Sequence, residues 1–263
     1  MIIKRVTSLD SEEVSVYIGL NERQLKRYNE PKDGIFICES VKVIRRAIDS
    51  GYQVESFFVE EKHLADVKAL GIDDVPIFVA RENVMKDITG YSLTGGVLSA
   101  MRRIRQREPK DIIESSSKIV LLDDIENPTN IGAIIRAGVA LGADAILLTE
   151  GCSDPLYRRA ARVSMGTVFQ CEWAYINRDD INILKENGFT IMALSLSEDS
   201  ESLGEMKLNT NKRAVVLGNE DHGISKDILD LCDMNVVIPM SNGVDSLNVA
   251  SASAIAFWEM FNK

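Results

Sequence analysis

Short apolar runs alternate with amphipathic segments along the whole chain, and this alternation predicts an α/β protein. In the second half the apolar runs are nearly continuous, as at 118–122 and 145–148. Continuous apolar strands are typical of a parallel sheet that helices cover on both faces. Further strands are predicted at 190–196, 214–217 and 236–238, an extended segment at 168–171, and helices at 131–141, 155–161, 181–187 and 248–261.

The first hundred residues show a second alternation that is complete in itself. Strands are predicted at 34–38, 54–59, 77–79 and 95–100, and helices at 11–29, 39–50, 63–70 and 81–89. The segment 104–117 is polar and charged and contains Pro109, which is typical of a linker. We therefore expect a first domain at 1–103, a linker at 104–117 and a second domain at 118–263.

The composition is that of a soluble globular protein, with 263 residues of which 45% are apolar and 27% charged. No run reaches the roughly 18 apolar residues that a membrane span needs, and the first ten residues lack the apolar core of a signal peptide. We therefore expect a cytoplasmic protein without a membrane anchor. Four cysteines without a CxxC pair, and two histidines, argue against a metal site.

The net charge of −10 argues at first against a nucleic-acid partner, but the charges are unevenly distributed. Residues 1–110 carry 18 basic and 17 acidic side chains, whereas residues 111–263 carry 12 and 23. The nearly neutral part ends in a basic cluster, and phosphate binding depends on local positive charge. The cluster is either a phosphate-binding site or a solvated linker, and it consists of Arg102, Arg103, Arg105, Arg107 and Lys110.

Three polar segments follow predicted buried strands, at the sheet edge where open α/β proteins bind ligands. The first runs from Asn127 to Arg136. Asn130 is expected to cap the helix that starts at Ile131, and the free N–H groups of that helix end favour an anion. Arg136 lies in the second turn of this otherwise apolar helix, where a guanidinium needs an anionic partner. That partner is either an internal carboxylate or a phosphate or ribose of a nucleic acid.

The second segment, Gly218 to Gly223, comes directly after a predicted strand. Gly218 permits the backbone to pass close to a ligand. Glu220 offers a carboxylate that could bond Arg136 or a loop amide. The alternative is an ordinary polar turn, and His222 is expected to be an exposed loop residue.

The third segment links the last predicted strand to the terminal helix. A proline ends the strand, and small residues lead into a helix that is itself rich in alanine and serine. Such a helix can approach another element or another subunit closely. Ser246 or Asn248 is either a helix N-cap or part of a binding site. The segment contains Ile238-Pro239-Met240 and Ser246-Leu247-Asn248.

Together the three segments resemble the three motifs of the SpoU (TrmH-like) branch of the SPOUT RNA 2′-O-ribose methyltransferases, over roughly residue 118 to the C-terminus. The resemblance implies that this α/β domain is tied into a deep trefoil knot and binds S-adenosylmethionine there. It also implies a homodimer in which each active site is completed across the interface. The family's catalytic positions fall on Asn130, Arg136, Glu220, Ser246 and Asn248, and its cofactor pocket on Gly218, Ile238 and Leu247, with Met240 and Leu194 nearby.

The first domain resembles the family's L30e/L7Ae-like substrate-binding module, on the pattern GIFICESVKVIRRAI at 34–48 and the alternation that follows. Many members carry a glycine-rich turn containing His and Gln, whereas residues 90–96 here read GYSLTGG. The module implies RNA as the partner. The basic residues that would contact this RNA are Arg102, Arg103, Arg105 and Arg107.

The resemblance therefore implies methyl transfer from S-adenosylmethionine to the 2′-hydroxyl of a ribose in RNA. A separate substrate domain looks more like the ribosomal members, so 23S ribosomal RNA is preferred over transfer RNA. One alternative is a non-catalytic RNA-binding or ribosome-assembly protein on the same fold. Another is an ordinary nucleotide-dependent α/β enzyme, but neither GxGxxG after a first strand nor a P-loop is present.

In the implied reaction the 2′-oxygen attacks the sulfonium methyl in line, so the protein mainly positions the reactants. Because arginine is effectively always protonated, we expect Arg136 to hold the phosphate beside the target ribose and to stabilise the developing alkoxide. Glu220 would orient Arg136, or accept the proton through water or a phosphate. Asn130, Ser246 and Asn248 would fix the ribose and the loops.

Overall fold

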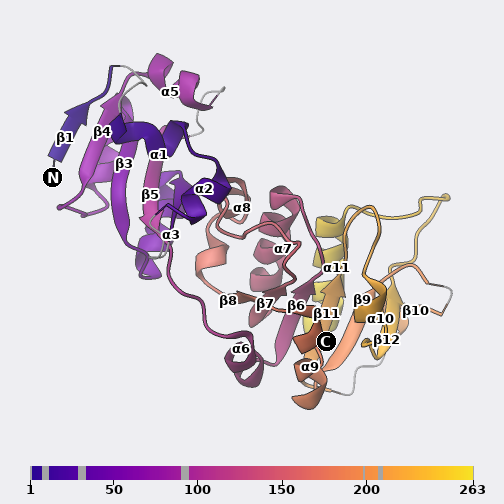
Figure 1. Ribbon diagram of the computed structural model, residues 1–263. Helices are drawn as coiled ribbons and strands as arrows, with labels where there is room; N and C mark the ends of the chain where they lie inside the picture. The colour runs from indigo at the N-terminus through magenta and orange to yellow at the C-terminus, as the bar shows by residue number, and fades with distance from the viewer. Residues whose placement is uncertain are drawn as a thin grey trace. The chain divides into compact units, whose positions relative to one another are not determined.

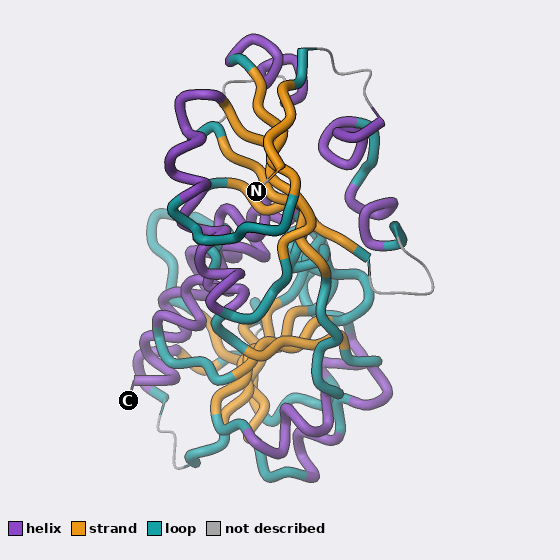
Figure 2. The backbone as a smooth tube through the Cα atoms, turned by 90° about the vertical axis from the view of Figure 1, so that its left-hand side faces the viewer, coloured by secondary structure: helices purple, strands orange, loops and turns teal. Residues whose placement is uncertain are grey.

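The computed structural model describes residues 2–7, 12–28, 34–89, 95–197, 199–206 and 210–262. The chain forms two compact units, each with its own sheet (Figures 1 and 2). Unit 1 contains Met1–Arg105 and also Leu156–Phe169, and unit 2 contains Gln106–Pro155 and Gln170–Lys263. Residues 90–94, in the turn that departs from the family pattern, lie outside the described residues. Within the described ranges, no helix is both long and apolar enough to cross a membrane.

Unit 1 is built on a mixed five-stranded sheet with the order β1-β4-β3-β5-β2. Strands β1, β4 and β3 run parallel, while β5 is antiparallel to β3 and β2. The four strands predicted here are confirmed, and β1 was missed. The elements are β1 (Ile2–Arg5), β2 (Ile35–Glu39), α3 (Val41–Asp49), β3 (Val54–Glu60), α4 (Leu64–Lys68), β4 (Pro76–Ala80), α5 (Glu82–Thr89) and β5 (Val97–Arg102).

The single helix predicted at 11–29 is wrong, because the chain forms two short helices, α1 (Ser15–Ile18) and α2 (Glu22–Lys26). Asn21 starts the second helix with a capping box. Its side chain accepts a hydrogen bond from the N–H of Gln24 at 2.9 Å, and the Gln24 side chain accepts one from the N–H of Asn21 at 2.9 Å. This reciprocal cap makes a new helix start more favourable than continuation.

Unit 2 is built on a seven-stranded sheet with the order β10-β12-β9-β11-β6-β7-β8. Every strand pair in it is parallel, which confirms the parallel sheet expected from the continuous apolar runs. The strands are β6 (Lys118–Leu122), β7 (Ala145–Leu148), β8 (Glu172–Tyr175), β9 (Thr190–Leu194), β10 (Glu201–Ser202), β11 (Arg213–Leu217) and β12 (Met234–Val237).

Helices cover both faces of this sheet. Ile119, Leu121 and their neighbours pack on one face with residues of α6, α9 and α10, whereas α7 and α11 pack against each other and against β7 and β11. The three polar segments follow β6, β11 and β12, so the parallel strands carry them to one edge. The helices are α6 (Pro109–Ser115), α7 (Pro128–Ala140), α9 (Ile183–Glu186), α10 (Lys226–Leu229) and α11 (Val249–Asn262).

The segment 104–117, expected to be a linker, contains helix α6, in which Ile112 and Ile113 are fully buried. Pro109 begins this helix rather than interrupting the chain. The segment 168–171 was expected to be extended. Its first two residues belong instead to a 3-10 turn, Thr167–Phe169. The Phe169 ring packs against Phe36 and Tyr52 of unit 1, with centroids 5.8 and 5.0 Å away.

Two cations hold the end of α11. Arg213 is buried, and its guanidinium donates to the carbonyl oxygens of Met260 at 2.5 Å and Thr210 at 2.8 Å. Lys118 Nζ donates to the carbonyl oxygen of Phe261 at 2.7 Å. Positive groups at a helix C-terminus satisfy its free carbonyls and its dipole.

We expect Arg213→Met to lower the free energy of unfolding by roughly 2 kcal/mol, because it leaves a buried carbonyl without its charged donor. Urea unfolding followed by circular dichroism would measure this loss. Lys226→Met, which removes an exposed cation of α10, is the control and should change the midpoint little. Equal midpoints for the two variants would contradict the role of Arg213.

Candidate active site

The first turn of α7 is capped by Asn127 rather than by Asn130, which corrects the expected cap. The helix begins at Pro128, and the Asn127 side chain accepts a hydrogen bond from the N–H of Thr129 at 2.9 Å. Proline is favoured at the first helical position, where its missing N–H costs nothing. As a result the Asn130 side chain is available for other contacts, although it is only 7% exposed.

Asn130 lies at the centre of a hydrogen-bonded cluster that joins all three polar segments. Its Nδ2 donates to Oε1 of Glu220. Its Oδ1 accepts from Nδ2 of Asn248 at 3.3 Å. Three of the five expected catalytic residues, far apart in the sequence, are therefore in contact at the carboxyl edge of the sheet.

Asn248 caps α11, which is the first of the two alternatives that the sequence left open, and its side chain also contacts Asn130. Its Oδ1 accepts a hydrogen bond from the N–H of Ala250 at 3.0 Å, as an N-cap of α11 does. Its Nδ2 meanwhile contacts Asn130. The cap on Ala250 thus fixes the orientation of the Asn248 amide. Ser246 is exposed, and no hydrogen bond joins its hydroxyl to another residue in the described ranges.

Arg136 is exposed on α7, and its guanidinium forms no ion pair or hydrogen bond with any residue that the structure describes. The internal salt bridge considered for it is therefore not seen among those residues. Glu220 contacts Asn130 rather than Arg136. Residues 130 and 136 are six apart, which places them about 120° apart around an α-helix, so Arg136 faces away from the cluster.

Three strands bring the expected cofactor residues to the same edge. Leu194 ends β9, Gly218 follows β11, and Ile238 follows β12, and these strands are neighbours. Leu194, Ile238 and Met240 are half-buried there. Large apolar side chains in the adjoining loops are exposed, namely Leu196, Val244 and Leu247. Apolar surface gathered at a ligand-binding edge fits a partly apolar ligand.

Gly218 closes a tight loop around Glu220. A Cβ atom at Gly218 would lie 2.3 Å from the carbonyl carbon of Gly223. The loop is held by two backbone hydrogen bonds between Asn219 and Gly223, of 3.0 and 2.9 Å. The close approach expected at Gly218 is therefore to the loop's own backbone, and His222 is exposed at the loop tip, as predicted.

The expected RNA-contacting arginines are partly paired within the chain. Arg102 pairs with Glu55, and Arg103 Nε donates to the carbonyl oxygen of Ile35 at 3.4 Å. Arg107 donates to the carbonyl oxygen of Asp111 at 2.9 Å and lies 3.7 Å from Glu172. Arg102, Arg105 and Arg107 are nevertheless exposed.

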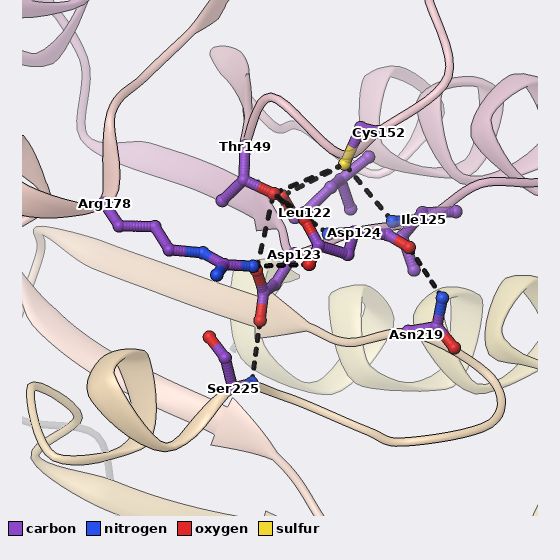
Figure 3. A network of polar contacts seen from close by, with 9 residues as sticks. All are labelled: Leu122, Asp123, Asp124, Ile125, Thr149, Cys152, Arg178, Asn219 and Ser225. Carbon is purple, nitrogen blue, oxygen red and sulfur yellow. Dashed lines mark hydrogen bonds and ion pairs between the residues drawn. The ribbon is translucent and has the colours of Figure 1, made fainter.

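A second polar network at the same edge was missed by sequence reasoning (Figure 3). It joins Asp123 and Asp124, which follow β6, to Thr149 after β7 and to Arg178 after β8. The sequence feature that could have indicated this network is the pair of acidic residues directly after a buried strand. Their cationic partner lies 54 residues further on, in a segment without a motif.

Comparison with known proteins identifies the family. The model of the SpoU rRNA Methylase family matches residues 117–258. The chain belongs to the SpoU rRNA methylase family. The match contains all three polar segments, so the resemblance seen in them is confirmed, as is the class of RNA methyltransferase.

Individual relatives agree with this assignment. An uncharacterised tRNA/rRNA methyltransferase of Mycobacterium bovis is 33% identical over 234 residues, which cover 86% of this chain and 80% of that protein. An AdoMet-bound rRNA methyltransferase from Sinorhizobium meliloti is 26% identical, with a TM-score of 0.81 over 98% of this chain and 97% of that one. The SpoU methyltransferase AviRb from Streptomyces viridochromogenes, 20% identical with a TM-score of 0.77 over 95% of each chain, shares the fold.

Proposed function

We propose that this protein transfers a methyl group from S-adenosylmethionine to the 2′-hydroxyl of a ribose in ribosomal RNA. The observation that carries the proposal is the cluster of Asn130, Glu220 and Asn248, which joins the three motif segments at one sheet edge. A non-catalytic scaffold has no need for a carboxylate that a motif asparagine orients at this edge, or for an exposed arginine that is unpaired among the described residues.

The residues at this edge fit the cofactor. The S. meliloti relative was solved with AdoMet bound. In this chain the tight loop after Gly218 presents backbone groups, and Leu194, Ile238, Met240 and Leu247 present apolar surface around it. Backbone polar groups with apolar walls suit an adenosine moiety. S-Adenosylmethionine supplies an electrophilic methyl group on a sulfonium.

The chain's own residues position the nucleophile. Arg136 is exposed and unpaired among the described residues, so its guanidinium is available to hold an RNA phosphate and stabilise the developing 2′-alkoxide. Glu220, oriented by Asn130, accepts the proton through water or a phosphate. Asn248 and Ser246 fix the ribose and the loop. The earlier alternative, in which Glu220 orients Arg136 within one chain, has no contact to support it.

Homodimer formation brings Arg136 to the cluster of a second copy. In one chain Arg136 faces away from Asn130, and the neighbouring helix α11 exposes Ile255 and, at 62%, Trp258. Exposed large apolar side chains on one helix are typical of an interface. If each site combines Arg136 of one protomer with Glu220 of its partner, co-expressed Arg136→Ala and Glu220→Ala chains should recover roughly a quarter of wild-type activity. A monomer, or mixed chains without activity, would contradict this arrangement.

Unit 1 supplies the RNA-binding surface, as an L30e/L7Ae-like module, and the chain of unit 2 is knotted as in the family. Residues 1–105 carry 16 basic and 16 acidic side chains. Helix α8 (Arg158–Val163) adds three arginines to unit 1, so unit 1 has a net charge of +3 and unit 2 of −13. Arg158 and Arg162 pair with the buried Glu39, at 2.9 and 3.0 Å. Arg159 is exposed and, among the described residues, unpaired.

Arg159→Ser and Arg105→Ser should therefore raise the dissociation constant for RNA and reduce the salt dependence of RNA binding, without changing cofactor affinity. Lys68→Ser, an exposed cation of α4, serves as the control. Filter binding at several salt concentrations measures the effect. Identical salt slopes for all three variants would show that Arg159 and Arg105 do not contact the RNA.

The function is tested by methyl transfer from radiolabelled S-adenosylmethionine to unmodified ribosomal RNA, transfer RNA and ribosomal particles, followed by alkaline hydrolysis. Alkali cleaves RNA through a free 2′-hydroxyl, so label in an alkali-resistant dinucleotide is the expected result, with ribosomal RNA the better substrate. Label released as a mononucleotide would mean base methylation. No label on any RNA, despite cofactor binding, would favour the non-catalytic alternative.

A further inference from the structure

The buried carboxylate of Asp123 lies between the end of β6 and the loop that carries Glu220. Asp123 is 1% exposed. Its Oδ2 accepts a hydrogen bond from the backbone N–H of Ser225 at 2.7 Å, and its Oδ1 accepts one from Arg178 Nη2 at 3.0 Å (Figure 3). The Oδ2 atom therefore fixes the loop at Ser225, and the Oδ1 atom binds the guanidinium of Arg178.

Asp124 holds the other end of the same loop. Its carbonyl oxygen accepts a hydrogen bond from Nδ2 of Asn219 at 2.8 Å. Its carboxylate accepts one from Oγ1 of Thr149 at 2.9 Å and pairs with Arg178. Asn219 and Ser225 stand on either side of Glu220, so both ends of the loop are fixed to one pair of consecutive aspartates.

Arg178 offsets part of the negative charge of this pair. It lies in the 3-10 turn Arg178–Asp180, which follows β8 and is outside all three motif segments. Its Nη2 reaches both carboxylates. Without a cation, two adjacent carboxylates, one of them buried, repel each other, and removing one partner of a buried ion pair is strongly unfavourable.

We propose that Arg178 is a positioning residue for the Glu220 loop, acting through Asp123 and Asp124. The same two aspartates lead directly into the turn that carries Asn130, so Arg178 fixes both partners of the Asn130–Glu220 hydrogen bond. The inference rests on the proposed function only for the catalytic role of Glu220. The loop geometry itself is independent of the reaction.

The chain offers a matched control at the opposite edge of the same sheet. Lys185 Nζ lies 3.3 Å from Oδ1 of Asp233, and Oδ2 of Asp233 accepts a hydrogen bond from the N–H of Ile191 at 2.8 Å. The side chains of Arg178 and Lys185 are 38% and 36% exposed. Both cations thus support an aspartate that caps a backbone N–H, but Ile191 is at the start of β9, away from the Glu220 loop.

The experiment compares Arg178→Met, Arg178→Lys and Lys185→Met in the full chain. Hydrogen exchange of peptides covering 218–226, cofactor affinity by calorimetry, and turnover at saturating RNA are measured together. We expect Arg178→Met to accelerate exchange in 218–226 and to lower turnover by about 10- to 100-fold, because small displacements of catalytic groups have effects of this size. Arg178→Lys should recover part of the loss, since lysine keeps the charge but has no planar fork.

A second variant separates positioning from general destabilisation. Asp123→Asn in the Arg178→Met background removes one of the two facing charges and keeps an oxygen for the N–H of Ser225. This double variant should be more active than Arg178→Met alone, which is a non-additivity expected of residues that act as one unit. If Arg178→Met does not fold, the activity of Arg178→Lys is compared with that of the double variant Arg178→Lys with Asp123→Asn. In this background we expect Asp123→Asn to give no gain in activity.

The inference is overturned if Arg178→Met and Lys185→Met have the same turnover and the same exchange in 218–226. It is also overturned if Asp123→Asn gives no recovery in the Arg178→Met background. If exchange accelerates as expected while the wild-type protein forms no alkali-resistant product, the positioning of the loop stands and the proposed reaction fails.

Discussion

Replacing Arg136 with alanine should lower turnover by roughly 10³-fold and leave the affinity for S-adenosylmethionine unchanged. The guanidinium is exposed on α7 and, among the described residues, unpaired, so its charge is available to an RNA phosphate rather than to the fold. Removing one donor that stabilises developing negative charge typically costs about 10²- to 10³-fold in turnover, and loss of the phosphate contact adds to this. Single-turnover methyl transfer and calorimetry measure the two quantities.

Arg136→Lys is the matched variant, because it keeps the charge and removes the bidentate geometry. It should retain more activity than Arg136→Ala at saturating RNA. Since the side chain is exposed and forms no ion pair or hydrogen bond with another described residue, thermal stability should be the same for all three proteins. Loss of cofactor binding in Arg136→Ala would assign this residue to the cofactor pocket and refute its role at the ribose.

Replacing Gly218 with alanine should weaken cofactor binding by at least about 100-fold. The added Cβ would lie 2.3 Å from the carbonyl carbon of Gly223 and 2.4 Å from the backbone nitrogen of Ile224. Both contacts are with backbone, so the loop has to open rather than a side chain rotate. Opening separates Asn219 from Gly223 and moves Glu220 away from Asn130, and turnover should fall with binding.

Gly204→Ala provides the control, because nothing lies within 4 Å of a Cβ built at Gly204. This variant should bind the cofactor as the wild-type protein does. Calorimetric titration with S-adenosylmethionine, together with hydrogen exchange over the loop, distinguishes a local opening from global unfolding. Tight binding by Gly218→Ala would show that the loop after β11 takes no part in the cofactor pocket.

The parallel sheet of unit 2 was predictable because its strands are buried on both faces and therefore read as continuous apolar runs. The start of α7 was misassigned because Asn127 and Asn130 are both good caps, and the position of Pro128 at the first helical residue decides between them. Helix α6 was not predicted because its segment is mostly polar and charged, although the adjacent Ile112 and Ile113 indicated burial.

Parts of the site depend on contacts that no local pattern encodes. Five catalytic candidates could be named from the sequence, but only the hydrogen bonds of the folded chain show that Asn130, Glu220 and Asn248 meet. The partner of Asp123 was not predictable, because Arg178 lies in a polar turn without periodicity or motif. Long-range ion pairs of this kind are set by tertiary packing rather than by neighbouring residues.

Because residues 156–169 belong to unit 1, cutting the gene once between the two units does not yield two fragments that each encode a complete unit. A fragment beginning at residue 106 would still carry this segment, with the apolar side chains of Leu156, Val168 and Phe169 that are buried in the intact protein. A fragment ending at residue 105 would lack the partners of Glu39. A protease that cuts once near residue 105 should therefore leave two pieces that remain associated through gel filtration, and exchanging the first domain between relatives requires exchanging 156–169 with it.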